Sequence, residues 1–400
     1  MKKTFAKILC LVLAICLLVP CFVSCGKTNY AEDNTKVKIG ISGPLTGGAA
    51  VYGIAVRNAA QLAIDEINQV AMAELGFQFE FVMTDDKHDK DNVPTNYSNM
   101  YESGMQISLG TVTTKPGLEF KELSNKDNLF VLTPSASGDA IPEYDNAFQM
   151  CFADSNQGSA SAAFFNANYA GKKIGIFYKS DDEYSTGIRA KFLDALNADL
   201  KATLKEASFK GEENQFDTQV NTLADCDVIF MPIYYTPASQ FMKAAVGKVA
   251  NNAVYYGCDG LDGIDAIDGF DISTIPQEVS YLSHFNSNAT DGAAAELIAK
   301  YNAKYDEAKE PLNQFGAAAY DCVYAIYEAL KVAKANGEKF DATTAPEDFC
   351  EILVDVFTSD DFVFHGVTGK AEANGKSNIS WAEDGFVNKE AVKYIVKEAD

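Results

Sequence analysis

Strand-like apolar runs alternate with helical segments along the first two thirds of the chain, and this alternation limits the possible folds more than any other feature. The spacing first predicts strands at 38–41, 77–84, 106–110 and 129–133, with helices at 53–74, 92–103 and 115–124. Strands that are separated by helices form βαβ units, which build a parallel sheet covered by helices. This part of the chain therefore predicts one doubly wound α/β unit.

The same pattern starts again after a strand-like link at 148–152. It predicts helices at 155–169, 184–200, 216–223 and 237–246, and strands at 173–178, 202–209, 228–233 and 254–257. An extended run at 279–285 then leads back to the first unit, and helices follow at 296–305 and 316–336. Residues 337–400 are less regular, apart from a final amphipathic run at 389–397.

We therefore predict the α/β class, with two doubly wound parallel-sheet lobes joined by a multi-strand hinge. A chain of this length is too long for one hydrophobic core. The first lobe is expected to comprise residues 36–154 and 283–378, and the second residues 155–282 and 379–400. Two lobes joined in this way leave a cleft, and hinge closure over a ligand is one use of that geometry.

The N-terminal residues have the pattern of an export signal rather than of a folded domain. Three lysines precede an uncharged apolar run at 8–23, which is shorter than a membrane-spanning helix. We predict a signal peptide at 1–24, because the residues Phe-Val-Ser-Cys at 22–25 resemble a bacterial lipobox. Cys25 would then carry lipid, and residues 25–35 would tether the protein to the bacterial cell membrane, on its outer face or in the periplasm. Plain secretion is the alternative.

The charge balance excludes one class of partner. The chain carries 33 basic and 56 acidic residues, a formal net charge of −23. A surface of this sign does not attract nucleic acid or anionic lipid. We therefore expect no nucleic-acid partner, and we interpret the acidity as a self-repelling, soluble surface.

A glycine-rich turn follows the first predicted strand, between Gly43 and Gly53. Glycine allows a sharp turn and a close approach of the backbone to a ligand. Ligands of open α/β sheets bind beyond the carboxyl ends of the strands, where helix N-termini also point. Tyr52 and the backbone from Leu45 to Gly48 are therefore candidates for a pocket wall. The alternative is an ordinary strand-to-helix turn.

Motifs of catalysis and of cofactor binding are absent from the sequence. It has no Gly-x-Gly-x-x-Gly, no phosphate-binding loop and no Gly-x-Ser-x-Gly elbow. The three histidines and the acid pairs at 85–86 and 360–361 are expected at the surface. We predict neither an enzyme, nor a cofactor, nor a metal site. Five widely spaced cysteines outside the signal are expected to be mostly buried thiols, although one disulfide stays open: Cys151, Cys226, Cys258, Cys322 and Cys350.

Several motifs together resemble the leucine/isoleucine/valine-binding proteins of ABC importers, which are type I periplasmic solute-binding proteins. The matching segments are Ile39 to Gly47, Tyr52-Gly53, Gln61 to Asn68, Thr84 to Asp86, Thr133 to Ser137, Tyr184 to Gly187, Tyr234 to Pro237, Gly257 to Gly260 and Tyr320 to Val323. Each motif is modest alone, but their order and spacing cover about residues 36–375. The resemblance implies that an amino acid binds between the lobes.

The resemblance also implies which residues hold that ligand. The carboxylate would be held by hydroxyl and N–H groups of two turns of the first lobe, at Thr113 or Thr114 and at Ser135, Ala136 and Ser137. The ammonium would be held by Asp259 of the second lobe. Aromatic residues would close the pocket, namely Tyr52, Tyr184 and one of Tyr234 or Tyr235. A zwitterion that leaves water needs both of its charges paired.

Each of these residues also has an ordinary structural interpretation. The two threonines could cap a helix, the tyrosines could pack against a sheet, and Asp259 lies in an Asp-Gly turn dipeptide. Asp262 and Asp265 are expected in solvent. The sequence departs from the family at His88, where some members have a disulfide cysteine, and at Asp259, where relatives often have Glu.

Three functions are compatible with these observations. The first is a monomeric substrate-binding lipoprotein that captures an amino acid, branched-chain or related, and delivers it to the membrane permease of an ABC importer. The second is a receptor-type protein that senses an amide or another small organic solute without transport. The third, a secreted α/β enzyme, lacks a nucleophile or cofactor motif. The side chain of the ligand is left open.

Overall fold

The computed structural model describes residues 35–372 and 375–399. The predicted signal peptide, lipidated Cys25 and the tether up to residue 34 lie outside these residues. Within the part of the chain that the structure describes, no helix has the length and apolarity needed to cross a membrane.

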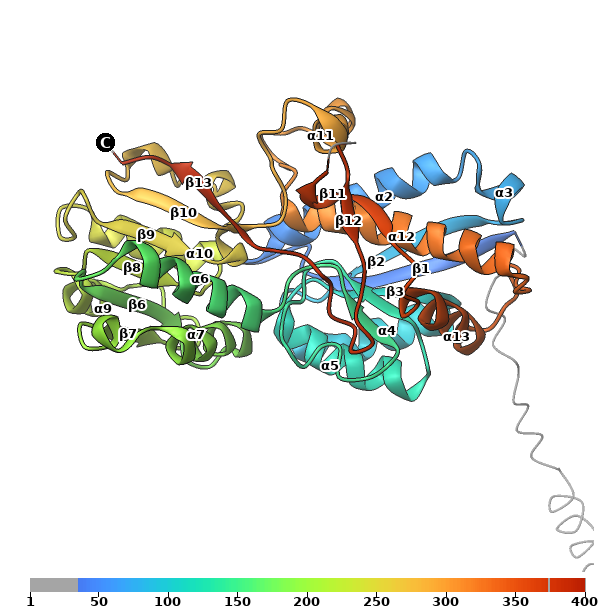
Figure 1. The fold of residues 1–400 in the computed structure, drawn as a ribbon, viewed down its shortest axis with the longest axis horizontal. Helices are drawn as coiled ribbons and strands as arrows, with labels where there is room; N and C mark the ends of the chain where they lie inside the picture. The colour runs from blue at the N-terminus through green and yellow to red at the C-terminus, as the bar shows by residue number, and fades with distance from the viewer. Residues whose placement is uncertain (1–34, 373–374, 400) are drawn as a thin grey trace, which may run out of the picture.

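A five-stranded parallel sheet organises the first lobe, at the right in Figure 1. Its strand order is β2-β1-β3-β4-β5. The strands are β1 (Lys36–Gly43), β2 (Gln78–Asp85), β3 (Met105–Thr111), β4 (Val131–Thr133) and β5 (Ala147–Gln149). Helices α4 (Val93–Glu102) and α5 (Thr114–Lys126) pack on one face, and α2 (Ala50–Ile67), α12 (Gln314–Asn336) and α13 (Pro346–Phe357) contribute to the main core on the other.

A six-stranded sheet organises the second lobe, with strand order β13-β10-β9-β8-β6-β7. The strands are β6 (Ile174–Lys179), β7 (Lys205–Phe209), β8 (Val228–Met231), β9 (Val254–Gly257), β10 (Glu278–Ser283) and β13 (Val392–Lys397). All neighbours are parallel except β10 and β13. Helices α6 (Asp154–Asn168) and α7 (Glu183–Ala195) pack on one face, and α9 (Asp217–Leu223) and α10 (Tyr235–Ala245) on the other. The predicted α/β class with two lobes is confirmed.

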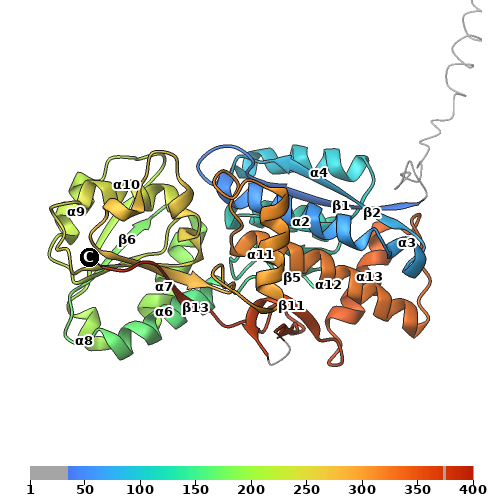
Figure 2. The same cartoon turned by 90° about the horizontal axis from the view of Figure 1, so that it is seen from above.

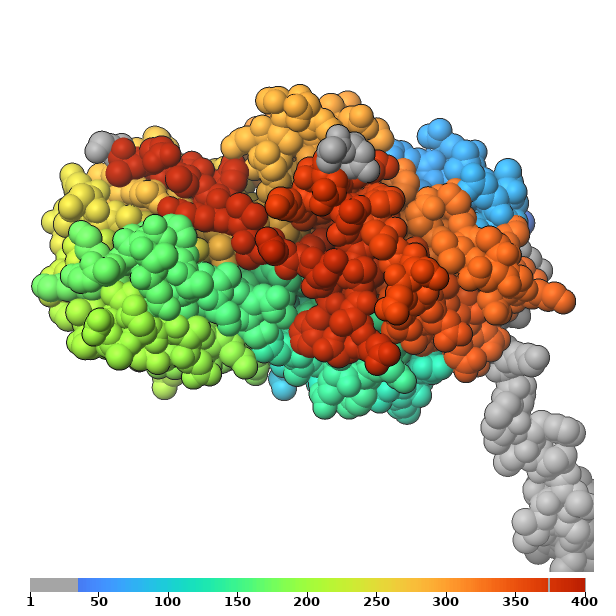
Figure 3. Space-filling model, viewed as in Figure 1, coloured from blue at the N-terminus to red at the C-terminus, as the bar shows by residue number. Residues whose placement is uncertain are grey.

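The chain passes between the two sheets three times. It leaves the first sheet after β5, leaves the second after β10, and returns to the second at β13. Between the last two passages lie α11 (Gly292–Lys304), α12, α13 and a hairpin of β11 (Phe364–Ala371) and β12 (Ser377–Ile379). Figures 1 and 2 show the lobes side by side, and Figure 3 shows the C-terminal segment spanning both. The boundaries at 154, 282 and 378 stay predictions.

Two predicted long helices are each divided. The helix expected at 53–74 becomes α2 and α3 (Ala71–Glu74), and at the end of α2 the side chain of Asn68 hydrogen-bonds the backbone of Phe79 in β2. The helix expected at 184–200 becomes α7 and α8 (Ala198–Lys201), because Leu196 is extended and the side chain of Asn197 caps a new helix.

Helix α13 was not predicted, although its sequence carries two signals. Pro346 stands in the first turn, followed by two acidic residues, and both features favour a helix N-terminus. Phe349, Leu353 and Phe357 then repeat every four residues and face the core. The periodicity of apolar residues in this stretch therefore predicts a helix.

Candidate functional site

The carboxyl ends of strands from both sheets meet at a small cavity between the lobes. Turns after β1, β3 and β4 reach it from the first lobe, and turns after β6, β8 and β9 from the second. The cavity has a volume of about 10 Å³, which is room for about one water molecule. Its lining consists of Tyr52, Val112, Thr113, Thr114, Ser135, Ser137, Tyr184, Tyr234, Asp259, Gly260 and Phe315.

Two of the ten residues that the sequence proposed for the ligand site do not line this cavity. Ala136 is fully buried behind it, where its N–H donates to Thr133 Oγ1 at 3.0 Å and is therefore already used. Tyr235 is the first residue of α10, and its ring packs edge-on against Tyr52. Its hydroxyl accepts a hydrogen bond from Val51 N at 3.2 Å. Of the two tyrosines left open, the structure brings Tyr234 to the cavity.

The first lobe contributes hydroxyl groups and a helix N-terminus to the wall of the cavity. Thr113 precedes α5 but makes no side-chain cap, so the capping interpretation is wrong for this residue. Thr114 Oγ1 accepts from Gly138 N at 3.2 Å, which leaves its own proton free. Ser135 Oγ instead donates to Val112 O at 2.6 Å. The first N–H groups of a helix have no partner within it, so this side favours an anionic group.

The side of the cavity from the second lobe contains a buried carboxylate. Asp259 follows β9, is 1% exposed, and accepts a hydrogen bond from Tyr184 Oη at 2.7 Å. Its Oδ2 has no hydrogen-bond partner in the described part of the chain. Burial raises the pKa of Asp259 to about 7. This carboxylate therefore lacks a compensating cation and favours one on a ligand.

A second buried acid lies behind Asp259. Asp154 opens α6, is 2% exposed, and burial raises the pKa of its carboxyl well above the ordinary value. Gln157, on the same helix face, accepts from Asp259 N through Oε1 at 3.0 Å. The charge of Asp259 contributes to the raised pKa of Asp154, so the two acids are coupled.

Aromatic rings form the rest of the lining and connect the lobes. Tyr184 and Tyr234 stack at 4.7 Å between ring centroids. Tyr52 packs edge-on against Phe315 at 4.8 Å, and its hydroxyl donates across the cleft to Gly260 O at 2.5 Å. Thr236 Oγ1 donates to Gly48 O, also across the cleft, at 2.8 Å. The lobes are thus in direct contact at the rim and floor of the cavity.

Four residues of the site were not predicted from the sequence. Val112 and Gly260 adjoin predicted residues, and Gly260 is required because an added Cβ would lie 2.7 Å from Tyr184 Oη. Gln157 holds the backbone of Asp259. Phe315 comes from the start of α12, and the only local signal is Asn313, whose side chain caps that helix.

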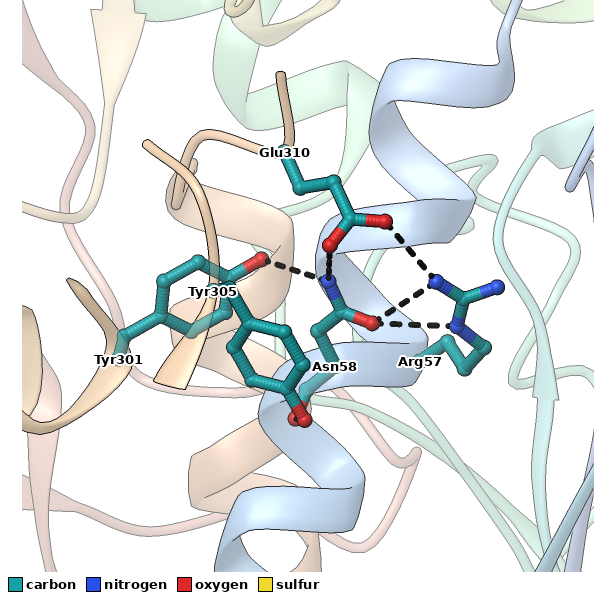
Figure 4. Close-up of polar contacts among 5 residues, drawn as sticks. All are labelled: Arg57, Asn58, Tyr301, Tyr305 and Glu310. Atoms are coloured by element: carbon teal, nitrogen blue, oxygen red, sulfur yellow. Dashed lines mark hydrogen bonds and ion pairs between the residues drawn. The ribbon is translucent and has the colours of Figure 1, made fainter. Parts of the chain in front are cut away.

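A polar network connects α2 to α11 and to the loop between α11 and α12 (Figure 4). Asn58 Nδ2 donates to Glu310 Oε2 at 3.1 Å and to Tyr301 Oη at 3.3 Å, and Arg57 donates to both Asn58 Oδ1 and Glu310. Tyr305 Oη donates to Asn58 O. Since Tyr52 lies on the same helix as Asn58, this network holds the helix that carries Tyr52 against α11.

Three residues expected at the surface are buried. Asp86 is fully buried and accepts from Ser42 Oγ. Asp262, 9% exposed, accepts from Tyr281 Oη and from Gln314 N, which begins α12 of the first lobe. His284, 3% exposed, packs edge-on against Phe152 where the chain passes between lobes. These predictions were wrong because long-range packing covers the three side chains.

The remaining predictions about histidine, acidic and cysteine side chains concern their exposure. His365 and Asp265 are exposed as expected, and His88 is half-buried. The five cysteines outside the predicted signal are free and buried, which confirms the thiol interpretation. Across residues 35–372 and 375–399, no group of three or more His, Cys, Asp or Glu side chains could hold a metal ion.

Comparison with known proteins matches this chain to one family model. The model is described as periplasmic binding protein and matches residues 36–349. The Leu/Ile/Val-binding protein BraC3 of Rhizobium johnstonii is 24% identical over 86% of this chain and 91% of its own length. A leucine-, isoleucine-, valine-, threonine- and alanine-binding protein of Pseudomonas aeruginosa is 24% identical over 78% of this chain and 83% of its own.

Solved structures with the same fold include proteins with different ligands. The leucine binding protein LivK of Thermotoga maritima aligns with a TM-score of 0.73 at 21% identity, over 90% of this chain and 95% of its own. LivJ of Streptococcus pneumoniae, in complex with isoleucine, aligns with 0.69 at 25% identity, over 90% and 100%. A solute binding protein of Rhodopseudomonas palustris, in complex with 3,4-dihydroxybenzoic acid, aligns with 0.72 at 17% identity, over 92% and 94%.

Proposed function

The chain belongs to the periplasmic binding protein family, and from this premise we propose that it is the extracytoplasmic substrate-binding lipoprotein of an ABC importer. Its ligand is an amino acid, branched-chain or related, which is captured between the two lobes. The named relatives support this substrate class, because their names specify leucine, isoleucine and valine. The protein itself performs no chemistry and passes the ligand to a membrane permease.

One observation carries the proposal: the second lobe presents a carboxylate to the cavity, and the first lobe presents hydrogen-bond donors. Asp259 Oδ2 is buried without a partner among the described residues on one side. Hydroxyl groups and the N-terminus of α5 lie on the other. An α-amino acid carries an ammonium and a carboxylate at a fixed separation, and charge-assisted hydrogen bonds to both are strong. Only the closed arrangement supplies both sets of contacts, so the ligand favours closure.

The size of the cavity sets a condition on binding. A volume of about 10 Å³ holds no amino acid. The direct contacts from Tyr52 to Gly260 and from Thr236 to Gly48 must therefore open before the ligand enters. Lobes that separate at a hinge and close again meet this condition.

Calorimetry tests the amino-acid ligand directly. The mature chain, unfolded and refolded to remove carried-over ligand, is titrated with each of the twenty amino acids. We expect binding of one or a few, with a Kd near the micromolar range, or roughly −8 kcal/mol. We expect Asp259→Ala to abolish it. Failure of every amino acid to bind would reject the proposal.

A second candidate ligand is an aromatic acid, sensed or transported. The neighbour with bound 3,4-dihydroxybenzoic acid and the three tyrosines at the cavity favour it. Such an acid has no ammonium, so Asp259 would stay buried and unpaired. Titration with 3,4-dihydroxybenzoate and with an amino-acid amide separates these ligand classes.

The membrane anchor and the oligomeric state are parts of the same proposal. The lipobox-like residues at 22–25 support lipidation of Cys25 and a location outside the cytoplasm. Cys25→Ser is expected to move the protein from the membrane fraction to the soluble fraction of a bacterial host. Sedimentation is expected to give a monomer of the mature chain.

A further inference from the structure

His88 occupies a constrained loop between β2 and α4. Lys87 and His88 both adopt left-handed backbone conformations, with φ of 57° and 61°. Such values are uncommon outside glycine, although histidine is enriched among the exceptions. The carboxylates of Asp85 and Asp86 accept from Lys87 N at 3.0 Å and from His88 N at 2.9 Å. The loop is therefore held in a conformation that directs the imidazole toward the cleft.

The imidazole of His88 contacts both sides of the cleft. Its Nδ1 lies 2.9 Å from Oγ1 of Thr113, which lines the cavity of the first lobe. The ring also packs edge-on against Tyr234 of the second lobe, with 5.1 Å between centroids. Since Thr113 makes no helix cap, the hydrogen bond to His88 decides where its hydroxyl proton points.

The state of the ring limits the possible hydrogen bonds. Burial, together with Lys179 and Lys115, lowers the pKa of His88 to about 4, so the ring is neutral near pH 7. A neutral ring has one N–H and one acceptor nitrogen. If Nδ1 carries the proton, it donates to Thr113 Oγ1, and the threonine proton is free for the cavity. If Nδ1 is the acceptor, the threonine hydroxyl donates its hydrogen bond to the ring and has no proton left for the cavity.

We infer that His88 is a positioning residue, whose Nδ1–H holds the Thr113 hydroxyl with its proton toward the ligand carboxylate. This inference rests on the proposed amino-acid site, because only an anionic ligand requires a donor at Thr113. His88 thus acts through Thr113 and sets the affinity for the acid group.

Three substitutions separate the contribution of the imidazole hydrogen bond from that of its ring packing. Asparagine places an amide nitrogen near the Nδ1 position and tolerates left-handed backbone, so His88→Asn is expected to bind within twofold of the wild type. His88→Phe keeps the ring on Tyr234 but loses the donor, and His88→Ala loses both. Each of these two is expected to weaken binding about fivefold, as for loss of one hydrogen bond. His365→Phe, at an exposed histidine of the first lobe, is the matched control.

A double-mutant cycle tests the route through Thr113. The Kd is measured with L-leucine, or with whichever amino acid binds most tightly in the panel above. Thr113→Val is expected to weaken binding roughly tenfold, and adding His88→Phe to it is expected to change the Kd less than twofold. Thermal unfolding without ligand checks that every variant is folded.

The outcomes distinguish this inference from the proposed function. Absence of binding to the wild type rejects the amino-acid site and the inference with it. Binding to the wild type that is unchanged in His88→Phe rejects the inference alone. Effects of His88→Phe and Thr113→Val that add fully, or a loss in His88→Asn as large as in His88→Phe, also reject it, because the imidazole would then act by another route.

Discussion

At the scale of single residues, Asp259 combines burial with an incomplete set of hydrogen bonds. Tyr184 and Gln157 satisfy one carboxylate oxygen and the backbone N–H, whereas Oδ2 has no partner among the described residues. Burial raises the pKa of Asp259 to about 7. Two consequences follow, one for ligand binding and one for stability.

Ligand affinity is expected to decrease as the pH falls below 7. The ammonium of the ligand binds the ionised carboxylate, so protonation of Asp259 competes with binding. With a pKa of about 7, affinity is expected to fall roughly 25-fold between pH 7.5 and 5.5. Calorimetry at both pH values measures it. A pH-independent Kd would contradict the assignment of Asp259.

The stability of the ligand-free protein is expected to show the opposite trend. The pKa of Asp259 is higher in the folded protein than in the unfolded chain, so the folded state binds more protons between about pH 4 and 7. The contribution of this group to stability is therefore lost as the pH rises to 7. Asp259→Asn is expected to increase the free energy of unfolding at pH 8 by about 1–3 kcal/mol. Equal stability of the two proteins in calorimetric melts at pH 8 would contradict this.

At the scale of elements, the turn from β1 into α2 depends on close backbone packing. A Cβ at Gly53 would lie 1.9 Å from Pro44 O, a backbone atom that cannot move aside easily. A Cβ at Gly48 would meet only Thr236 Oγ1, at 3.8 Å. The structure therefore has no room for a side chain at Gly53 but has room for one at Gly48.

Gly53→Ala is expected to lower the free energy of unfolding by about 1–3 kcal/mol, because overpacking forces the turn to shift. Gly48→Ala is the matched control and is expected to change it by less than about 0.5 kcal/mol. Melting temperatures from calorimetry compare them. Equal melting temperatures for the two variants would show that the turn adapts freely.

The contact of α2 with α11 and with the loop after α11 depends on a buried amide. Asn58 is 3% exposed and hydrogen-bonds Glu310, Tyr301 and Arg57 through its side chain. Asn58→Ala is expected to destabilise the protein by about 1–3 kcal/mol, because the buried Tyr301 and the partly buried Glu310 each lose a hydrogen-bond partner. Gln61→Ala, one turn along the same helix and partnered only with Asp65 in the described structure, is the control. A similar effect of both substitutions would contradict the role of the network.

At the scale of the whole molecule, closure depends on a few contacts between lobes. Thr236 donates to Gly48 O, Tyr52 donates to Gly260 O, and Asp262 accepts from Gln314 N. These hydrogen bonds join the second lobe directly to the first. The position of the open–closed equilibrium is therefore sensitive to each of them.

Thr236→Val is expected to shift the ligand-free protein toward the open arrangement. It removes one hydrogen bond between lobes, worth about 0.5–1.5 kcal/mol. Small-angle X-ray scattering is expected to give a larger radius of gyration without ligand and the wild-type value with it. Thr222→Val, whose bond to Thr218 O lies within α9, is the control. An unchanged radius in both variants would contradict the role of this contact.

Local sequence patterns determined much of what the structure shows. Alternating strands and helices predicted two α/β lobes, because secondary structure follows from the periodicity of apolar residues over short spans. The resemblance to leucine/isoleucine/valine-binding proteins proposed the hydroxyl and acidic side chains that line the cavity. Thr113, Ser135 and Asp259 each follow a strand, and strand ends are where such folds bind ligands.

Only the tertiary structure decided which side chains share one cavity and which are buried. Phe315 reaches the site from a helix far along the chain, Tyr234 rather than Tyr235 faces the cavity, and His88 contacts Thr113 and Tyr234 from a separate loop. Asp262 and His284 are covered by residues distant in sequence. Burial and contact depend on the packing of distant segments, which local periodicity does not encode.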